Sequence, residues 1–306
     1  TGYERWLARA ESVRDAAEEA HVAGHLVTAH QCYLRAAEYY RQAYFYLRAD
    51  LDDQRLRDAY QAHCHTFARA MELLTHTSSP IVAEQVSIPY ATVETRVSIH
   101  GWLFRPTADD RPRPTIVMPC GYDSTAESGW GFAQGALARG YNVLSVEGPG
   151  QGSTLINDRI YFRPDYEVVL SQILDWLGTV PDVDNRRLVA QGRSFAGYLI
   201  PRGVAGESRV AAMICDPAQP DMGAKIPAGW KGRIAAPLMT VLGRISRERA
   251  DFFASRMACH GVHTIAEYLT ELGSFTMLDR AGDISCPTFI VAVSYTHLTL
   301  PTTPYV

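Results

Sequence analysis

The chain has 306 residues, of which 47% are hydrophobic, and a formal net charge of −4 at pH 7. This apolar fraction excludes a wholly disordered chain, and the length suits one large α/β domain with a smaller helical one. The slightly acidic balance gives no general attraction to nucleic acid or to anionic membranes, so we expect neither as a partner. No run approaches the roughly 18 apolar residues that span a bilayer. The six cysteines form no CxxC pair, which indicates reduced thiols in a cytoplasmic protein.

The first 75 residues show the spacing of amphipathic helices. Apolar side chains recur at helical intervals in residues 33–47 and again in residues 56–74. Between these runs, Asp50 to Asp53 offer capping side chains for the second helix. Residues 75–80 are rich in turn formers and mark a boundary. We therefore expect residues 1–80 to form an N-terminal helical cap.

After this boundary the period changes to that of an α/β protein. A β-hairpin is predicted first, and short apolar runs then alternate with helical stretches. The predicted strands are 82–88, 95–104, 115–118, 142–146, 188–191, 210–215 and 288–293, and the helices lie near 126–139, 165–178 and 195–206. This alternation predicts a mostly parallel sheet with helices on both faces, over residues 81–293. In such sheets the chemistry lies at the carboxyl ends of the strands.

Residues 217–282 interrupt the alternation. They carry several prolines and two further predicted helices, near 246–258 and 264–272. The simplest interpretation is an insertion between the sixth and seventh strands, placed where it helps to cover the site.

The strongest functional signal is a nucleophile elbow around Ser194. The residues Gly192-Arg-Ser-Phe-Ala196 follow an apolar strand and precede a helix, which fits the G-x-S-x-G pattern with alanine in the last position. Gly192 and Ala196 are small because a tight turn leaves no room beside the nucleophile. The turn exposes the Ser194 hydroxyl and places the Phe195 N–H at a helix start, where it can bind an oxyanion. Arg193 then lines the site.

A second loop offers the other oxyanion donor. The strand that ends at Met118 leads into Pro-Cys-Gly121-Tyr122-Asp123-Ser-Thr, and the Tyr122 amide is the donor by position. Gly121 lets the chain approach the substrate closely, and Asp123 lines the site. The alternative is an ordinary loop in which Asp123 or Ser124 caps the next helix. The two roles are compatible, since one uses the backbone and the other a side chain.

The glycine-rich stretch 147–153 does not indicate a nucleotide site. It has the spacing G-x-G-x-G with a proline inside, whereas the dinucleotide fingerprint needs G-x-G-x-x-G, and G-K-[ST] is absent from it. We expect a tight loop that flanks a hydrolase pocket.

These motifs, in this order, resemble the FrsA-like esterase group, which includes hydrolases similar to 2,6-dihydroxypseudooxynicotine hydrolase. The resemblance rests on Gly-Tyr-Asp-Ser-Thr at 121–125, Glu-Gly-Pro-Gly-Gln-Gly at 147–152, residues 162–167 and the elbow at 192–197, with a cap-like helix at 35–47. It covers about residues 20–293 and implies the α/β-hydrolase fold, a Ser–Asp–His triad, no metal or cofactor, and a small-molecule substrate with a reactive carbonyl. It also implies a possible homodimer with a site between cap and core.

The chain departs from that pattern at its end. The resemblance places the triad aspartate after the strand at 288–293 and the histidine after one further strand. Residues 294–306 contain no carboxylate side chain and no further strand followed by a histidine. We interpret this tail as non-native, so that the last strand and helix, the triad Asp and the triad His are missing and activity is low. His297, His260 and His263 are the substitutes considered for the base, and a surface or cap position is favoured for all three.

Other polar groups carry weaker signals. His21 and His25 are one helical turn apart and His63-Cys64-His65 is a local cluster, but the sequence shows no convergence of metal ligands, and we expect no metal. The tyrosines of residues 33–46 either line a substrate pocket or pack the cap. Asp216 follows a strand; it either positions substrate or replaces the triad acid, but helix capping or loop hydrogen bonding is the favoured role.

The leading hypothesis is therefore a serine hydrolase that attacks an ester, amide or activated ketone through Ser194, with Tyr122 and Phe195 as the oxyanion hole. The alternative within enzymes is hydrolysis of a C–C bond in an aromatic or diketone-like substrate. From another class, a non-catalytic hydrolase-like protein that binds a ligand or partner stays open.

Overall fold

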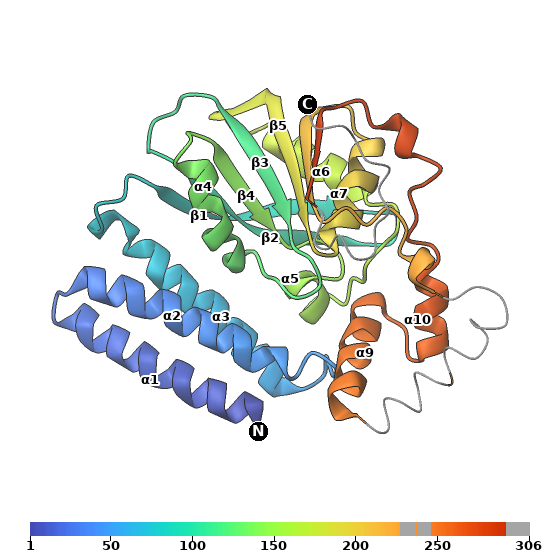
Figure 1. Cartoon of the computed structure of the whole chain (residues 1–306). Helices are drawn as coiled ribbons and strands as arrows, with labels where there is room; N and C mark the ends of the chain where they lie inside the picture. Colours follow the sequence, from blue (N-terminus) through green and yellow to red (C-terminus); the bar gives the residue numbers. More distant parts are fainter. Residues whose placement is uncertain (227–236, 238–245, 292–306) are drawn as a thin grey trace.

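The structure is a computed structural model that describes residues 1–226, 237 and 246–291. Its centre is a seven-stranded sheet in the order β1-β2-β4-β3-β5-β6-β7 (Figure 1). The hairpin β1–β2 and strand β4 pair antiparallel, while β3, β4, β5, β6 and β7 run parallel. The strands are β1 Val82–Ala91, β2 Arg96–Arg105, β3 Arg113–Pro119, β4 Asn142–Val146, β5 Val183–Arg193, β6 Val210–Asp216 and β7 Thr288–Ile290.

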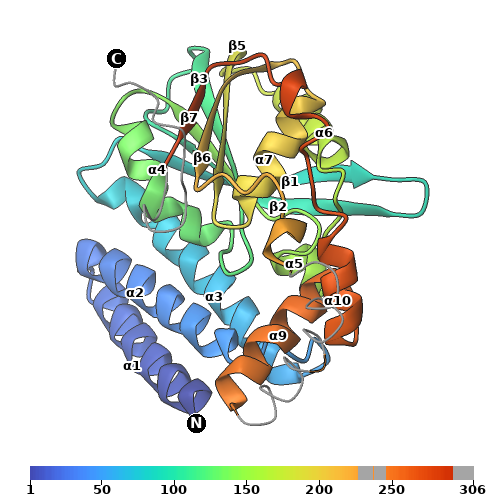
Figure 2. The ribbon, with the colours of Figure 1, turned by 45° about the vertical axis from the view of Figure 1, so that its right-hand side comes forward.

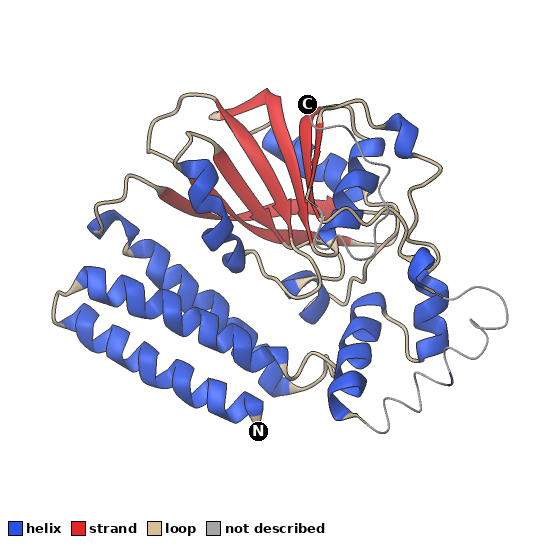
Figure 3. Cartoon of the chain, viewed as in Figure 1, coloured by secondary structure: helices blue, strands red, loops and turns tan. Residues whose placement is uncertain are grey.

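Helices cover both faces of the sheet, as Figure 3 shows by element type. They are α4 Trp130–Leu137, α5 Gly152–Ile156, α6 Glu167–Leu177 and α7 Ala196–Ala205. Helices on both sides explain why β4 is buried along its whole length and why β3 is buried almost throughout. The fold is therefore the predicted α/β arrangement with a mostly parallel sheet.

The N-terminal region forms a layer of helices beside the sheet (Figure 1). Its helices are α1 Gly2–Val22, α2 Leu26–Phe45 and α3 Gln54–Glu72. Asp53 caps α3 by accepting a hydrogen bond from the Arg55 N–H, as predicted. The layer joins the core through shared apolar packing, for example where the ring of Phe67 on α3 meets that of Trp102 on β2 with their centroids 5.1 Å apart. This layer matches the expected cap, although the division into domains stays a prediction.

Helices α9 Arg247–His260 and α10 Ile265–Leu272 follow β6, at the positions predicted for the insertion. Figure 2 shows them beyond the carboxyl ends of the parallel strands, next to the chain that links α2 to α3. They pack into the main core through Cys259 of α9 and through Tyr268 and Leu272 of α10. The insertion therefore stands near the site rather than on a remote surface.

The predicted boundaries hold to within a few residues, with three exceptions. β5 begins at Val183 rather than near 188, because backbone pairing with β3 continues past a register shift. The helix expected over 126–139 is divided into a 3₁₀ turn, Glu127–Gly129, and α4. The short helix α5 was not predicted, since five residues are too few for a periodic signal. The tail 294–306 lies outside the described residues.

Candidate active site

Ser194 occupies the sharp turn between β5 and α7. Its φ of +57° lies in the left-handed region, which a residue with a side chain rarely adopts. The Ser194 N–H donates to the carbonyl of Asp216 on the neighbouring strand, at 2.8 Å, and this bond holds the turn in place. The side chain is exposed. The strained backbone thus presents the hydroxyl at the carboxyl edge of the sheet, where the elbow motif predicts it.

The small residues around the elbow are required by close backbone packing. A Cβ on Gly192 would lie 2.1 Å from the carbonyl oxygen of Ala196, and one on Gly197 would lie 1.8 Å from that of Pro217. Neither backbone atom can move away without shifting a strand or a helix. Steric packing, rather than a need for backbone flexibility, therefore requires glycine at position 192.

The second loop lies directly against Ser194. A Cβ built on Gly121 would be 3.1 Å from the carbonyl oxygen of Arg193 and 3.3 Å from the Cβ of Ser194. The Gly121 N–H donates to the Ser124 hydroxyl, which shapes the loop. Within the described residues, the amides of Tyr122 and Phe195 have no hydrogen-bond acceptor. One N–H group without an acceptor therefore lies in the elbow, and another lies in the loop that packs against it.

A cavity of about 570 Å³ opens beside Ser194, between the cap and the core. Its wall combines the elbow and the Gly121 loop with side chains of α2, α3 and α4. The apolar part is formed by Leu34, Ala37, Phe67, Met118, Trp130 and Phe132, and the polar part by Glu38, Arg41, His63, Asp123, Thr125, Glu127 and Arg193. Arg193 also lies over the Phe132 ring, 4.0 Å from its centroid. A mainly apolar pocket with a few placed polar groups is typical of a small-molecule site.

The tyrosines of α2 contribute packing rather than this pocket. Tyr33, Tyr40 and Tyr44 are buried in the cap, and none of them lines the cavity. Of the two roles left open for them, the structure supports packing.

The polar end of the cavity contains a buried histidine–carboxylate network that was not recognised in the sequence. His63 Nδ1 donates to the Ala37 carbonyl at 2.8 Å, which leaves Nε2 to meet the Thr125 hydroxyl at 2.8 Å and Glu127 Oε2 at 3.4 Å. Both His63 and Glu127 are only 2% exposed. The sequence showed His63 as part of a local His-Cys-His run, and only the fold brings it to Glu127.

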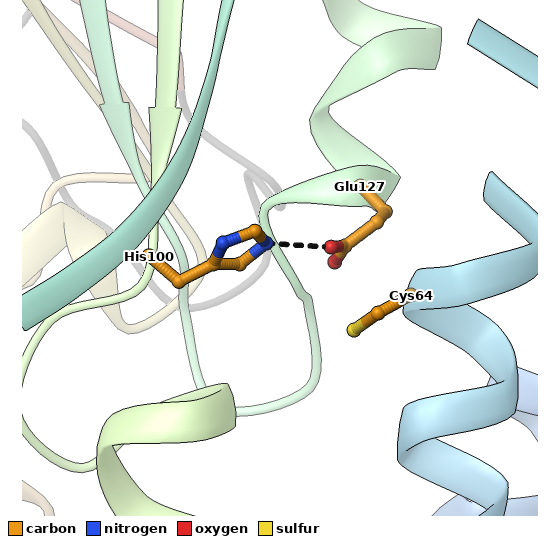
Figure 4. Close-up of side chains that lie close together, drawn as sticks. All are labelled: Cys64, His100 and Glu127. Carbon is orange, nitrogen blue, oxygen red and sulfur yellow. Dashed lines mark hydrogen bonds and ion pairs between the residues drawn. The ribbon is translucent and has the colours of Figure 1, made fainter. Parts of the chain in front are cut away.

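Glu127 ties this network to the sheet (Figure 4). Its Oε1 accepts from His100 Nε2 at 2.7 Å and from Trp102 Nε1 at 3.2 Å. Burial disfavours the charged imidazole, but the hydrogen bond and charge of Glu127 outweigh it and raise the pKa of His100 to about 9. Burial likewise opposes ionisation of Glu127, yet His100 and His63 lower its pKa well below the usual value. The pair is therefore an ion pair at neutral pH.

Potential metal ligands converge at the same place. The ligand atoms of Cys64, His100 and Glu127 lie within 4.8 Å of one another, a convergence that was not visible in the sequence. Burial and the charges of Glu127 and Glu147 raise the pKa of the Cys64 thiol well above its usual value. A thiol must lose its proton to bind a metal, and Glu127 Oε1 is already shared by two donors. We therefore interpret Cys64, His100 and Glu127 as part of a hydrogen-bonded network rather than as metal ligands.

The loop at 147–153 forms a second buried carboxylate site instead of a phosphate cradle. Glu147 is fully buried and accepts from the Tyr60 hydroxyl of α3 at 2.7 Å and from the Ser153 N–H at 2.9 Å. A Cβ on Gly152 would collide with this carboxylate, at 1.9 Å. Burial and the charge of Glu127 raise the pKa of Glu147. Its carboxylate accepts hydrogen bonds from the backbone amides of Ser153 and Ala126, and through Tyr60 it joins the cap to the core.

The histidines considered as substitutes for a catalytic base have different positions. His260 is buried in a cluster of aromatic rings and its Nε2 meets the Tyr122 hydroxyl at 2.5 Å. Burial and the charge of Arg256 lower the pKa of His260 to about 3. Of the surface or cap position expected for it, His260 has the second, because it is buried at the end of the inserted helix α9. His263 is exposed, and His297 lies outside the described residues. In the described part of the chain, no histidine hydrogen-bonds to the Ser194 hydroxyl.

Asp216 serves the elbow through its backbone. Its carbonyl accepts from the Ser194 N–H, and its carboxylate lies 3.9 Å from Arg193 Nε. Among the roles left open, the structure supports loop hydrogen bonding.

A strained serine between strand and helix, on a mostly parallel sheet with helices on both faces, defines the α/β-hydrolase class. The family model described as "Esterase FrsA-like" matches residues 6–220. The chain belongs to this FrsA-like esterase family and is a hydrolase. No helix among the described residues is long and apolar enough to cross a membrane.

Several curated relatives are named hydrolases from fungi. Hydrolase LUC6 of a Fusarium species is 30% identical over 95% of this chain and 73% of its own length. Hydrolase acrC of Aspergillus aculeatus is 29% identical over 98% and 75%. The 20-hydroxy-prefusarin hydrolase FUS2 of Gibberella moniliformis is 34% identical over 70% of this chain and 51% of its own.

Among solved structures, 2,6-dihydroxy-pseudo-oxynicotine hydrolase is similar in fold, with a TM-score of 0.75. It is 22% identical, over 95% of this chain and 73% of that one.

Proposed function

We propose that this protein is a serine hydrolase in which Ser194 attacks a substrate carbonyl and the amides of Tyr122 and Phe195 bind the resulting oxyanion. The observation that carries the proposal is the strained, exposed Ser194, with φ of +57°, beside two amides that have no acceptor among the described residues. Backbone N–H groups fixed in advance around a developing negative charge are a major source of rate acceleration.

The chemistry follows from this geometry. The Ser194 oxygen forms a bond to the carbonyl carbon, and the carbonyl electrons move to its oxygen, which the two amides stabilise. The serine proton passes to a base and then to the leaving group, whose bond to carbon breaks. Water repeats the attack and releases the acid. The base and its carboxylate partner are not assigned to any described residue.

The cavity sets the kind of substrate. Its volume of about 570 Å³ and its apolar wall suit a medium-sized organic molecule that places a carbonyl at Ser194. We propose an ester, amide or activated ketone.

Cleavage of a C–C bond is the second candidate. A carbanion leaving group needs a proton donor inside the pocket, and His63 lines the cavity next to Glu127. A diketone substrate would separate the two reactions, since C–C hydrolysis releases a ketone and a carboxylic acid.

The test is labelling by a fluorophosphonate probe, with the modified residue mapped by mass spectrometry. We expect labelling at Ser194 in the unmodified chain and none in Ser194→Ala. Hydrolysis of a nitrophenyl ester should fall at least about a hundredfold in the same variant. Ser208→Ala is the matched control, because Ser208 is exposed just before β6, at the opposite end of the strands.

Two results would contradict the proposal. One is labelling that survives Ser194→Ala, which would place the nucleophile elsewhere. The other is a chain that stays unlabelled even when extended with the C-terminal region of a relative, which would favour a ligand-binding protein without catalysis.

A further inference from the structure

The loop that carries the Tyr122 amide is held from outside the hydrolase core. The carboxylate of Asp123 receives Arg48, which follows cap helix α2, and Arg256 of the inserted helix α9. Arg48 Nη2 lies 2.7 Å from Oδ1, and Arg256 places Nη1 at 2.7 Å from Oδ1 and Nη2 at 2.8 Å from Oδ2. Paired contacts of this kind fix both distance and orientation.

Arg48 and Arg256, together with Arg41 of α2, also contact the backbone and the tyrosine ring of the loop. Arg48 Nη1 donates to the Tyr122 carbonyl at 2.8 Å, and Arg41 of α2 donates to the Asp123 carbonyl at 2.9 Å. The guanidinium of Arg256 lies 4.4 Å from the centroid of the Tyr122 ring. Three arginines from two separate segments thus restrain the carbonyls of Tyr122 and Asp123, the Asp123 carboxylate and the Tyr122 ring.

Burial makes these contacts strong. The side chains of Arg48 and Arg256 are 12% and 9% exposed, so water competes little for the two guanidinium groups, although the Asp123 side chain is 39% exposed. Burial opposes ionisation of Asp123, but Arg256 and Arg48 together lower the pKa of its carboxyl. The carboxylate therefore keeps its charge, and with it the link between cap and insertion, at any pH near neutrality.

The loop needs such restraint because of Gly121. A glycine beside the donor amide makes a flip of the Gly121–Tyr122 peptide sterically easy, and a flip would replace the N–H by a carbonyl oxygen. Neither Arg48 nor Arg256 lines the cavity. Their effect on catalysis can therefore only be indirect.

We propose that Arg48 and Arg256 are positioning residues that fix the Tyr122 amide toward the oxyanion, so that the cap and the insertion must both be docked for the site to be competent. This inference rests on the proposed function in so far as it concerns catalysis, whereas the restraint of the loop is a property of the fold.

The first experiment measures ester hydrolysis and fluorophosphonate labelling of Arg48→Met and Arg256→Met. We expect kcat and the labelling rate to fall about 10- to 100-fold, with KM changed less than about threefold, because the lost interaction acts in the transition state. Arg48→Lys and Arg256→Lys keep a charge without the planar fork and should recover part of the rate.

The matched control is Arg105→Met. Arg105 pairs with Asp182 and Glu84, its side chain is 16% exposed, and it lies at the end of β2 far from the loop. It should cost stability without a selective loss of kcat. An equal loss of kcat in Arg105→Met and in the Arg48 and Arg256 variants would overturn the proposal. An unchanged kcat in the Arg48 and Arg256 variants would overturn it as well.

Hydrogen–deuterium exchange decides the structural part even if the chain proves inactive. Peptides that cover 119–128 contain the Gly121 and Ala126 amides, which are bonded to Ser124 and Glu147. Their exchange should quicken about tenfold in Arg48→Met and Arg256→Met, and not in Arg105→Met. Unchanged exchange in the first two variants, with circular dichroism showing that they are folded, would disprove the restraint. Faster exchange in a chain whose Ser194 never reacts would instead retain the restraint and reject the proposed function.

Discussion

At the scale of single residues, the site depends on two glycines, because a Cβ atom at either position would meet neighbouring backbone. Ser194 can keep its left-handed backbone only because Gly192 leaves room for the Ala196 carbonyl, and the Gly121 loop can approach only because Gly121 has no side chain. Such strain is retained where the surrounding packing over-determines the conformation. Here the surroundings are a strand, a helix and the hydrogen bond from Ser194 to Asp216.

This packing gives a prediction for Gly192→Ala. The new methyl group would lie 2.1 Å from a helix carbonyl, so the turn must shift. We expect a loss of about 1–3 kcal/mol in unfolding free energy and a severe loss of Ser194 labelling. Urea denaturation and probe labelling measure the two effects.

Gly135→Ala is the control for Gly192→Ala. Gly135 is exposed inside α4, and an added Cβ would meet only the flexible end of Arg139 at 3.7 Å. Alanine there should be neutral or stabilise the helix. A tolerated Gly192→Ala with normal labelling would show that the elbow is less constrained than its geometry indicates.

At the scale of elements, α3 connects the cap to the core through buried polar groups. Tyr60 donates to Glu147 and His63 meets Thr125 and Glu127, so one helix face supplies both contacts. Apolar packing around Phe67 and Trp102 lies beside them. Hydrogen bonds of fixed geometry give a helix a single register where apolar contact alone would permit sliding.

Tyr60→Phe tests this connection. The variant removes only the hydroxyl, which leaves Glu147 with fewer donors in a fully buried position. We expect the unfolding free energy to fall by about 1–3 kcal/mol, measured by urea denaturation. Tyr46→Phe, which removes a hydroxyl from a side chain that is 54% exposed, should have no measurable effect. An equal effect in both variants would contradict a specific role for Tyr60.

At the scale of the whole molecule, the buried charges give the stability a definite pH dependence. The pKa of His100 is raised from 6.5 to about 9 in the folded chain, and those of Glu127 and Asp123 are lowered. The contribution of His100 is therefore complete below pH 6.5 and is lost as the pH rises through 9. The carboxylates contribute above their unfolded pKa values and lose that contribution in acid.

We accordingly predict that the difference in unfolding free energy between the unmodified chain and His100→Gln is largest near pH 6. It should shrink by up to about 3 kcal/mol by pH 9.5, as measured by urea denaturation at several pH values. His65→Gln, which changes an exposed histidine on α3, controls for the substitution itself. A difference that stays constant from pH 6 to pH 9.5 would mean that His100 is not charged in the folded chain.

The sequence by itself determined most of the elements and indicated the turns from which the candidate site is built. Hydrophobic periodicity located the seven strands and most of the helices, because the pattern of burial repeats within each element. The elbow at Ser194 and the loop at Gly121 were identifiable since turns between strand and helix depend on near neighbours. Tyr122, Phe195, Asp123 and Arg193 follow from their places beside those turns.

Only the tertiary structure decided which distant side chains meet. Asp123 and Arg256 are 133 residues apart in sequence, and Glu147 and Tyr60 are 87 apart. Such pairs carry no local periodic signal, because packing of whole helices against the sheet brings them together. The sequence likewise gives no sign that His63 lies beside Glu127 or that His260 meets Tyr122, because only the fold brings these residues together. The elbow that carries Ser194 is therefore determined by a few consecutive residues, whereas the side chains that surround it come from distant parts of the chain.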